Sequence, residues 1–565
     1  MRVSAKTSTN NEALGNGTNR FTIFRIQPEL QETSSSSSRG RSSKGKEKVA
    51  YGAVQTVPKP TKGPRQGYIS SGARMALIME EELKKNQSAS DYYLNHLIRG
   101  EYYIHENIIR TRNVVISNLE QVIKQWIENV KANKGIVNDN SEEEEFQLLE
   151  GGSEILGTTA YWSDMDILCV LPKYISIYDF IAEDEFGLYG ALMTVENLEN
   201  INAVKTSRIF MIEFTMYGID VDLIYAQIPY EKIETDFDIM DNEIIQWNKD
   251  KRSILALAGV RCLKNIIHIS PNQGLFVMLM RYVKIWAKNR LIYSNKAGYL
   301  SGHSLAIMSA KICIAYPEAT SLSFVIKQFF ISYKSWKWEA YPLMLVGLVD
   351  ANEEFENASE IVEPWSGTGS SQQRGTNEGN DGTQMSIITP GFPEQNTTFN
   401  VNKFTLKRIV IELKRGFTLI ERYSHQEATK IWDLLIKELD WKTHYNYFIL
   451  ILCRAGEFET GYCNRQSVLL RTYLYNWEKE NEQYKLIRAS HLIPNYEGNV
   501  ICLNSTKFDG LTSCKMWIVG VNLTSENFQI LMIDEIFKTS STKPNSLYSV
   551  YATKSNLEAM YQSGL

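Results

Sequence analysis

The chain has 565 residues, too many for one hydrophobic core, so we expect two to four domains. Apolar residues make up 43% and charged residues 22%, as in ordinary globular proteins, and the net charge of −5 excludes a surface that is basic throughout. A cleft that holds one short strand needs only local positive charge, so the overall charge does not decide for or against nucleic-acid binding.

The seven cysteines form no CxxC pair and match no zinc spacing with histidine. Those in the apolar runs DILCVL and AKICIAY are typical of free buried thiols, which indicates a reducing compartment and argues against structural zinc. No apolar run approaches the length of a membrane span, and the first residues lack a signal-peptide core. We therefore expect a soluble intracellular protein that does not enter membranes.

The first predicted segment is a disordered basic arm, residues 1–71. It is rich in Ser, Thr, Gly, Asn and Lys, and residues 1–67 hold twelve Lys or Arg against four Glu, a charge of +8. Such a composition cannot bury enough apolar surface to become ordered. A nuclear-import signal, an RNA-contacting arm and a solvated tail all fit this pattern.

Residues 72 to about 135 have helical periodicity. The apolar positions that carry it are Ile108, Val115, Leu119, Val122 and Trp126. Strand-like runs follow an acidic loop, and their sequences are FQLLEG, MDILCVLP and RIFMIEFTMYGIDVDLIYA. Residues 248–350 read as helices again. The pattern therefore predicts a mixed α/β unit followed by a helical one.

Residues 351–385 lack periodicity and are rich in Glu, Asn, Gly and Ser, which predicts a flexible insertion inside a domain. The remaining chain mixes strands (YNYFILILC, CKMWIVGVNL) with helical pieces (ATKIWDLLIKEL, SVLLRTYLYNW). We expect an α+β unit there.

The segment GGSEILGTTAYWSDMDILCVLP carries the chemistry. Gly152 and Ser153 predict a tight turn whose N–H groups and hydroxyl can face phosphate oxygens. Asp164 and Asp166 run into an apolar strand, and residues i and i+2 of a strand share a face. Two adjacent carboxylates repel one another unless a cation lies between them. Oxygen ligands suit Mg²⁺ and Mn²⁺, so a pair of such ions is expected here.

A third acid comes from a second apolar strand, IDVDLIYA, which contains Asp220 and Asp222. Alternation places both acids on one face and the apolar residues between them on the other. An Asp-x-Asp pair alone is common on protein surfaces. The turn, the pair and the third acid occur here in order, which favours a two-metal site.

This order resembles the signature of the DNA polymerase β-like nucleotidyltransferases: Gly-Ser, a ten-residue gap, Asp-x-Asp and a distal Asp. Longer blocks resemble nuclear-type poly(A) polymerases of eukaryotes and large DNA viruses. They are SDMDILCVLPKY, RYVKIWAKNRLIYSNKAGYLSGHSLAIMSAKICIAYPEA, IITPGFPEQNTTFNV and CKMWIVGVNL. The four blocks follow the family's order between about residues 72 and 540.

The resemblance implies a multidomain α/β and α+β fold. A nucleotidyltransferase catalytic domain would span residues 72–247, and a helical central domain 248–425 with the insertion 351–385. An α+β, RRM-like RNA-binding domain would span 426–565.

The activity implied is template-independent addition of AMP from ATP to RNA 3′ ends by a polynucleotide adenylyltransferase that uses two Mg²⁺ or Mn²⁺ ions. ATP and the RNA 3′ end would be its partners, with cleavage and polyadenylation factors as candidates and the oligomeric state open. The implied location is nuclear, or cytoplasmic or virion-associated for a viral protein. Two alternatives stay open: a terminal uridylyltransferase of the same fold, and a non-catalytic RNA-binding subunit of another polymerase.

Position by position, the resemblance implies that Asp164 and Asp166 bind both metals and that Asp222 binds the metal beside the RNA 3′-OH. Asp220 falls at a non-catalytic position and is excluded. The implied nucleotide contacts are Gly152, Ser153, Lys284 and Tyr293 at the phosphates, Asn295 at the adenine edge, and Gly302 and His303 beside the base. On the helix FTLKRIVIELKRG, Lys407 and Arg408 are expected to meet the RNA backbone, with a solvated face as the alternative.

The sequence departs from the family around the nucleotide. Ala258 replaces an Asn near the sugar, Gly151 replaces an aromatic residue before Gly-Ser, and the sequence SGHS at 301–304 replaces Gly-Gly-Val. The metal ligands are intact. The sequence therefore defines the chemistry more firmly than the choice of nucleotide.

Overall fold

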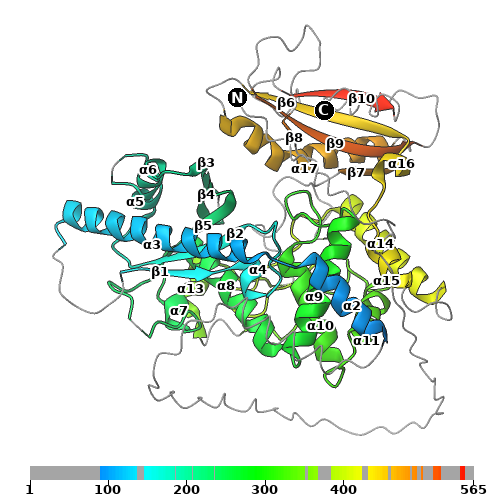
Figure 1. Ribbon diagram of the computed structural model, residues 1–565, viewed down its shortest axis with the longest axis horizontal. Coiled ribbons are helices and arrows are strands. Elements are labelled where there is room, and N and C mark those ends of the chain that lie inside the picture. The colour runs from blue at the N-terminus through cyan, green and yellow to red at the C-terminus, as the bar shows by residue number, and fades with distance from the viewer. Residues whose placement is uncertain are drawn as a thin grey trace.

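The computed structural model describes residues 89–136, 145–349, 354–366, 384–422, 430–455 and 460–483, apart from single residues at 185, 207 and 235, and the strands 487–492, 498–499, 513–523 and 547–553 (Figure 1). The predicted basic arm, 1–71, lies outside these residues.

A five-stranded mixed sheet organises the first part of the chain. Its strands are β1 (Gln147–Glu150), β2 (Met165–Leu171), β3 (Leu198–Lys205), β4 (Phe210–Met216) and β5 (Ile219–Gln227), in the order β1-β2-β5-β4-β3. β2 and β5 are parallel, and the other neighbours are antiparallel. Four strands match the predicted runs. β3 was not predicted, because it is an edge strand whose sequence, LENINAVK, is largely polar and half-exposed.

Each face of this sheet packs into a different core. Met165, Ile167 and Cys169 pack with α3 (Glu106–Lys134), α5 (Ile177–Ile181) and α6 (Leu188–Met193). Leu168 and Val170 lie in the other core, with α4 (Gly152–Ile155) and the central helices. Strand alternation thus places Asp166 on the second face, toward α4 and α8 (Lys251–Ile269).

The helical region before the sheet consists of two helices. α2 (Ala89–Glu101) contacts α9 (Gln273–Asn289) and α11 (Leu322–Tyr333), far along the chain (Figure 1). Its Leu94 and Ile98 lie in the core of the central helices. Asp91 Oδ1 accepts a 2.6 Å hydrogen bond from the backbone N–H of Ser323. α2 therefore packs on the central helices, although it lies within the residues predicted as the catalytic domain.

Along α3, the predicted apolar stripe is largely correct. Val115, Leu119 and Trp126 are buried, whereas Ile108 and Val122 are only half-buried and Ile123 lies in the core instead. Because a helix has 3.6 residues per turn, the buried face of a long helix drifts around its axis. Packing therefore decides which of two neighbouring apolar residues is buried.

The central helices form the largest core, and the helical pattern of residues 248–350 predicted the helices in that range. They are α7 (Glu243–Gln246), α8 (Lys251–Ile269), α9 (Gln273–Asn289), α10 (Gly302–Ala315), α11 (Leu322–Tyr333), α13 (Glu356–Ile361), α14 (Lys403–Arg422) and α15 (Lys430–Ile436). Ser301 caps α10 through a capping box with Ser304, which fixes the direction in which the first turn of that helix faces. None of the helices in the described parts of the chain is long and apolar enough to cross a membrane.

Two expectations about this region need correction. Residues 354–366, inside the predicted flexible insertion, include the helix α13, and Phe355 stacks on Phe392 with ring centroids 4.4 Å apart. That part of the insertion is folded because Phe355, Ala358 and Val362 are buried. The predicted boundary at residue 425 also separates α15 from the core in which its Trp432 is buried.

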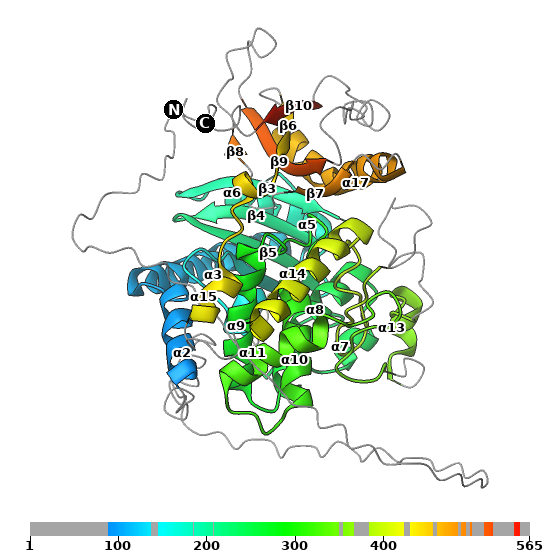
Figure 2. The ribbon, with the colours of Figure 1, turned by 90° about the vertical axis from the view of Figure 1, so that its right-hand side faces the viewer.

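The last part of the described chain is an antiparallel sheet with one long helix (Figure 2). Its strands are β6 (Tyr447–Ala455), β7 (Ile487–Leu492), β8 (Gly498–Asn499), β9 (Ser513–Leu523) and β10 (Leu547–Thr553), in the order β10-β6-β9-β7 with β8 beside β9. α16 (Trp441–His444) precedes it, and α17 (Thr460–Gln483) places Leu470, Leu474 and Trp477 against it. The mixture of helix and strand is as predicted.

Within the described part of the chain, Cys169, Cys262, Cys313 and Cys453 are buried and form no disulfide. This agrees with the expectation of buried thiols in the apolar runs.

Candidate active site

The acids of the candidate site lie at the start of β2 and in the neighbouring part of β5. These strands are parallel, and the backbone register pairs Asp166 with Asp222. Asp164 lies two residues before Asp166, just outside the strand. Asp220 is exposed on β5, and its Oδ1 accepts a 2.8 Å hydrogen bond from the Thr215 hydroxyl. The structure thus pairs Asp222, not Asp220, with the Asp-x-Asp strand.

Gly152 lies directly over the Asp166 carboxylate. Its φ is +44°, and a Cβ atom there would stand 1.7 Å from Asp166 Oδ2. Gly151 donates a 2.8 Å backbone hydrogen bond to the Asp166 carbonyl, which attaches the turn to β2. Only glycine at 152 permits this approach and this backbone conformation. The predicted tight turn is present as the first residues of α4, which also hold Ser153.

Negative charge gathers on this face of the sheet. Burial and the charge of Asp164 together raise the pKa of Asp166 to about 6, although Lys284 opposes the shift. Burial and the charges of Asp166, Asp164 and Glu213 raise the pKa of Asp222 to about 7. Asp166 and Asp222 resist ionisation because they are largely removed from water and other carboxylates lie close by.

The charge and donor set suit a hard divalent cation, which accepts carboxylate oxygens and would relieve this repulsion. As their side chains lie, no group of three or more His, Cys, Asp or Glu in the described residues could hold a metal ion. The three acids therefore share a face without converging on one point. Asp164, Asp166 and Asp222 are the residues that would hold such an ion.

Cations from α9 face the acids. Lys284 is 8% exposed and donates a 3.3 Å hydrogen bond to the Thr158 carbonyl. Burial and the neighbouring charge of Lys288 together lower its pKa to about 8, although Asp164 and Asp166 oppose this shift. Lys288, one helical turn later, lies 5.1 Å from the Trp162 ring centroid and 5.7 Å from that of Tyr293. The sequence reading did not single out Lys288, although its i, i+4 spacing from Lys284 predicts a shared helix face.

Tyr293 lies between the acids and α10. Burial raises the pKa of its hydroxyl, and the charges of Asp164 and Asp166 raise it further. A Cβ atom on Gly302, at the start of α10, would lie in van der Waals contact with the same hydroxyl, 3.4 Å away. Tyr293 thus lies near both the acids and the first turn of α10.

The loop that joins α4 to β2 is held by arginines. Arg281 Nε donates a 2.7 Å hydrogen bond to the Gly157 carbonyl. Arg112 donates to the Ser163 carbonyl and forms a 2.8 Å ion pair with Glu154 on α4. These contacts fix the backbone that leads from α4 into the acid pair, as preorganised sites require.

A cavity of about 340 Å³ adjoins the start of α10 and brings together three predicted nucleotide positions: Ala258, Asn295 and His303. His303 is half-buried, and burial lowers its pKa although a hydrogen bond with the Gly259 backbone opposes the shift. A neutral imidazole therefore borders the cavity. Arg208, from the loop between β3 and β4, also lines it and was not predicted.

Arg208 connects that loop to the segment after residue 384. Its Nη2 donates a 2.8 Å hydrogen bond to Gln395 Oε1, and its guanidinium lies 4.8 Å from the Phe399 ring centroid. The cavity is thus enclosed by the sheet's loop on one side and by α8, α10 and residues 389–399 on the other.

The predicted RNA contacts on α14 separate into two environments. Lys407 is exposed, whereas Arg408 is 6% exposed and lies 5.8 Å from the Tyr445 ring centroid. Neighbouring helical positions point about 100° apart, so the two side chains do not share a face. The expectation that Arg408 meets an RNA backbone is not supported, because its side chain is buried.

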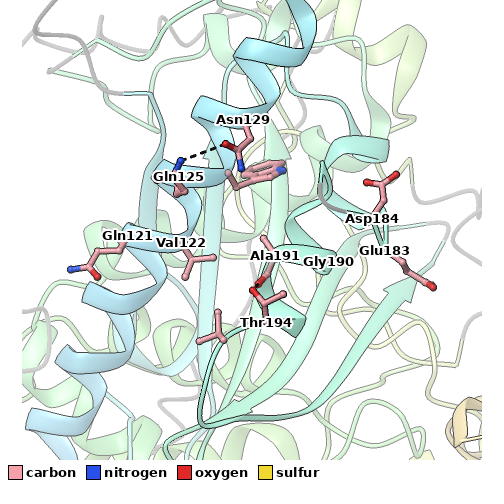
Figure 3. Close-up of a pocket in the computed structure, with 11 residues that line it drawn as sticks. Gln121, Val122, Gln125, Asn129, Glu183, Asp184, Gly190, Ala191 and Thr194 are labelled. Atoms are coloured by element: carbon pink, nitrogen blue, oxygen red, sulfur yellow. Dashed lines mark hydrogen bonds between the residues drawn. The ribbon is translucent and has the colours of Figure 1, made fainter.

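A second cavity, of about 590 Å³, lies between α3 and α6 on the other side of the sheet (Figure 3). Gln121, Gln125 and Asn129 border it from α3, and Glu183 and Asp184 from the segment before α6. None of the predicted site residues lines it, so it is separate from the candidate active site.

Two domain models of one family match the chain. Residues 76–269 match the poly(A) polymerase nucleotidyltransferase domain. This range contains the first sheet and its acids, which therefore belong to a nucleotidyltransferase domain. Residues 275–438 match the poly(A) polymerase central domain. The two matches together cover more than half of the 565 residues, and the chain belongs to the poly(A) polymerase family.

Curated relatives agree with this assignment. A poly(A) polymerase of Dictyostelium discoideum is 32% identical over 61% of this chain and 40% of its own length. Nuclear poly(A) polymerases 2 and 4 of Arabidopsis thaliana are each 26% identical over 71% of this chain and over 47% and 50% of their own lengths. The chain spans about half, or less, of these relatives.

Among solved structures, a Cid1 poly(U) polymerase bound to MgATP covers 62% of this chain and 98% of its own, with 15% identity and a TM-score of 0.42.

Proposed function

We propose that this protein adds AMP from ATP to RNA 3′ ends without a template and uses two divalent ions, Mg²⁺ or Mn²⁺. The observation that carries the proposal is the register of Asp166 with Asp222 on parallel strands, under Gly152 and opposite Lys284. Membership of the poly(A) polymerase family supports it.

In the proposed reaction, the RNA 3′ oxygen forms a bond to the α-phosphorus of ATP while the bond from that phosphorus to the pyrophosphate oxygen breaks. Bound metal ions supply the positive charge that lowers the pKa of the 3′-OH and neutralises the leaving pyrophosphate. Asp164 and Asp166 would hold both ions, and Asp222 would hold the one beside the 3′-OH.

The protein's own cations and amides position the nucleotide. Lys284 and Lys288 face the acids and would attract the triphosphate, with Tyr293 donating from its protonated hydroxyl. Gly152 and Ser153 would present the turn to phosphate oxygens. The adenine would enter the cavity beside Asn295, with His303 against its ring.

The domain arrangement is proposed with the activity: a catalytic domain around the first sheet, a helical central domain and an RRM-like RNA-binding domain around the second. Lys407 is the proposed RNA contact on α14. Nuclear relatives support a nuclear location.

One observation keeps a second candidate, a terminal uridylyltransferase. The cavity contains Ala258 and His303 where the family has an amide and an apolar residue, so the surroundings of the base are altered.

The experiment is extension of a labelled oligo(A) primer by the purified protein with each of the four ribonucleotides. We expect Mg²⁺- or Mn²⁺-dependent incorporation that prefers ATP. Asp164→Ala, Asp166→Ala and Asp222→Ala should each abolish extension with the fold retained, and Asp220→Asn serves as the matched control that keeps most activity. Equal use of UTP and ATP would favour the uridylyltransferase, and no incorporation of any nucleotide would favour a non-catalytic subunit.

A further inference from the structure

The amide of Asn295 is held on two sides inside the cavity wall. Its Nδ2 donates a 2.9 Å hydrogen bond to the Thr397 carbonyl, and its Oδ1 accepts a 2.7 Å hydrogen bond from Asn400 Nδ2. Asn400 is 8% exposed, and the same Nδ2 also donates a 3.2 Å bond to the Asn295 carbonyl. Asn400 therefore contacts Asn295 through both its backbone and its side chain.

The network leaves neither amide free to rotate by 180°. The Thr397 carbonyl can only accept, so the nitrogen of the Asn295 amide must face it. The backbone carbonyl of Asn295 can also only accept, so the side-chain Nδ2 of Asn400 must face it. The side-chain Oδ1 of Asn295 must then face the same Nδ2. Thr397 is itself anchored, since its N–H and hydroxyl both donate to the Ile387 carbonyl at 2.8 and 2.9 Å.

The orientation of this amide matters for the choice of base. A primary amide has two N–H donors and an oxygen that accepts two bonds, so one donor and one acceptor site of Asn295 remain for a ligand. An adenine edge offers an amino donor beside a ring-nitrogen acceptor, which an asparagine amide can match in one orientation. Uracil offers an N–H donor beside a carbonyl acceptor in the opposite order, so the rotated amide would match uracil instead.

We propose that Asn400 is a positioning residue that sets nucleotide choice by fixing the orientation of the Asn295 amide. The inference rests on the proposed function, because it concerns the base of the incoming nucleotide. Asn400 acts through Asn295.

The test compares two variants of the full chain. Asn400→Asp places a carboxylate oxygen against two acceptors of Asn295, and Asn400→Ala only removes the donor. We expect the ratio of kcat/KM for ATP to that for UTP to fall about five- to thirtyfold in Asn400→Asp and less in Asn400→Ala, as for loss of one buried hydrogen bond. The change should lie mainly in KM.

A matched control is Asn402→Ala. Asn402 is 3% exposed and accepts hydrogen bonds from the backbone N–H groups of Phe404 and Thr405 at the start of α14. It is not among the residues that line the cavity. Its loss should lower the melting temperature and leave the ATP-to-UTP ratio unchanged, which separates a structural effect from a positioning effect.

Asn400→Asp and Asn400→Ala proteins with the wild-type ratio would overturn the inference while the proposed function stands. The same holds if Asn402→Ala changes the ratio equally. Where Asn400→Asp does not fold, Asn400→Ala alone carries the comparison. An unmodified protein that extends no primer would overturn the proposed function and, with it, this inference.

Discussion

Replacing Gly152 by alanine should disable the chemistry while the protein stays folded. The new Cβ would stand 1.7 Å from Asp166 Oδ2 and 2.7 Å from its Cγ, so the carboxylate must move by more than an ångström. A displacement of about 1 Å at a catalytic group can cost roughly a hundredfold in rate. The positive φ adds about 1–2 kcal/mol of backbone strain. We therefore expect kcat to fall at least about a hundredfold.

Gly218→Ala is the matched control. Gly218 has a φ of +77°, and a Cβ atom there meets no atom within 4 Å. The substitution introduces similar backbone strain in the turn between β4 and β5 without touching Asp166. It should lower the unfolding free energy by about 1–2 kcal/mol and leave the rate nearly unchanged.

The assay is single-turnover primer extension at saturating ATP and metal, with thermal unfolding of both variants measured in parallel. A Gly152→Ala protein that extends RNA at the wild-type rate would refute the reasoning, because Asp166 would then tolerate displacement. Equal rate losses in the two variants would refute it too, because strain alone would explain them.

Three further predictions follow from the structure. Glu412→Gln should lower the unfolding free energy by about 3–5 kcal/mol, as measured by denaturant unfolding. The reason is that the buried Glu412 accepts hydrogen bonds from Arg290 at 2.9 and 3.1 Å and from Arg415 at 2.7 Å. Burial raises the pKa of Asp433 to about 7, so the folded state loses stability as the pH rises from about 4 to 7. Asp433→Asn should therefore be more stable than the wild type by about 2–4 kcal/mol at pH 8. Melting curves should show this difference in stability shrinking toward pH 5. His303→Val should change KM for ATP more than kcat, because His303 borders the cavity and does not contact the acids. Steady-state extension kinetics measure both constants, and a fall in kcat alone would contradict the prediction.

Local sequence patterns were sufficient for four of the five strands of the first sheet and for the order of the acids. β2 and β5 are runs of apolar residues, and their alternation placed Asp166 and Asp222 on faces opposite their buried neighbours before any fold was known. The family resemblance also selected Asp222 over Asp220, which matches the register in the structure. Such features depend on neighbours within a few residues, so the sequence records them directly.

Other features arise from contacts between distant segments. α2 packs on α9 and α11 through Leu94 and Ile98, and α13 is folded because Phe355 meets Phe392, but neither partner is visible in the local composition. The burial of Arg408 likewise follows from its packing near Tyr445.

The sequence by itself therefore predicted which acids would hold metal, because charge and strand alternation are local properties, and the family resemblance implied the phosphate contacts. Only the tertiary structure brought Ala258, Asn295 and His303 to one cavity, added Arg208 to its wall, and placed Asn400 against the Asn295 amide. Those residues lie on separate elements, and hydrogen bonds between them form only when the helices and loops that carry them have packed together.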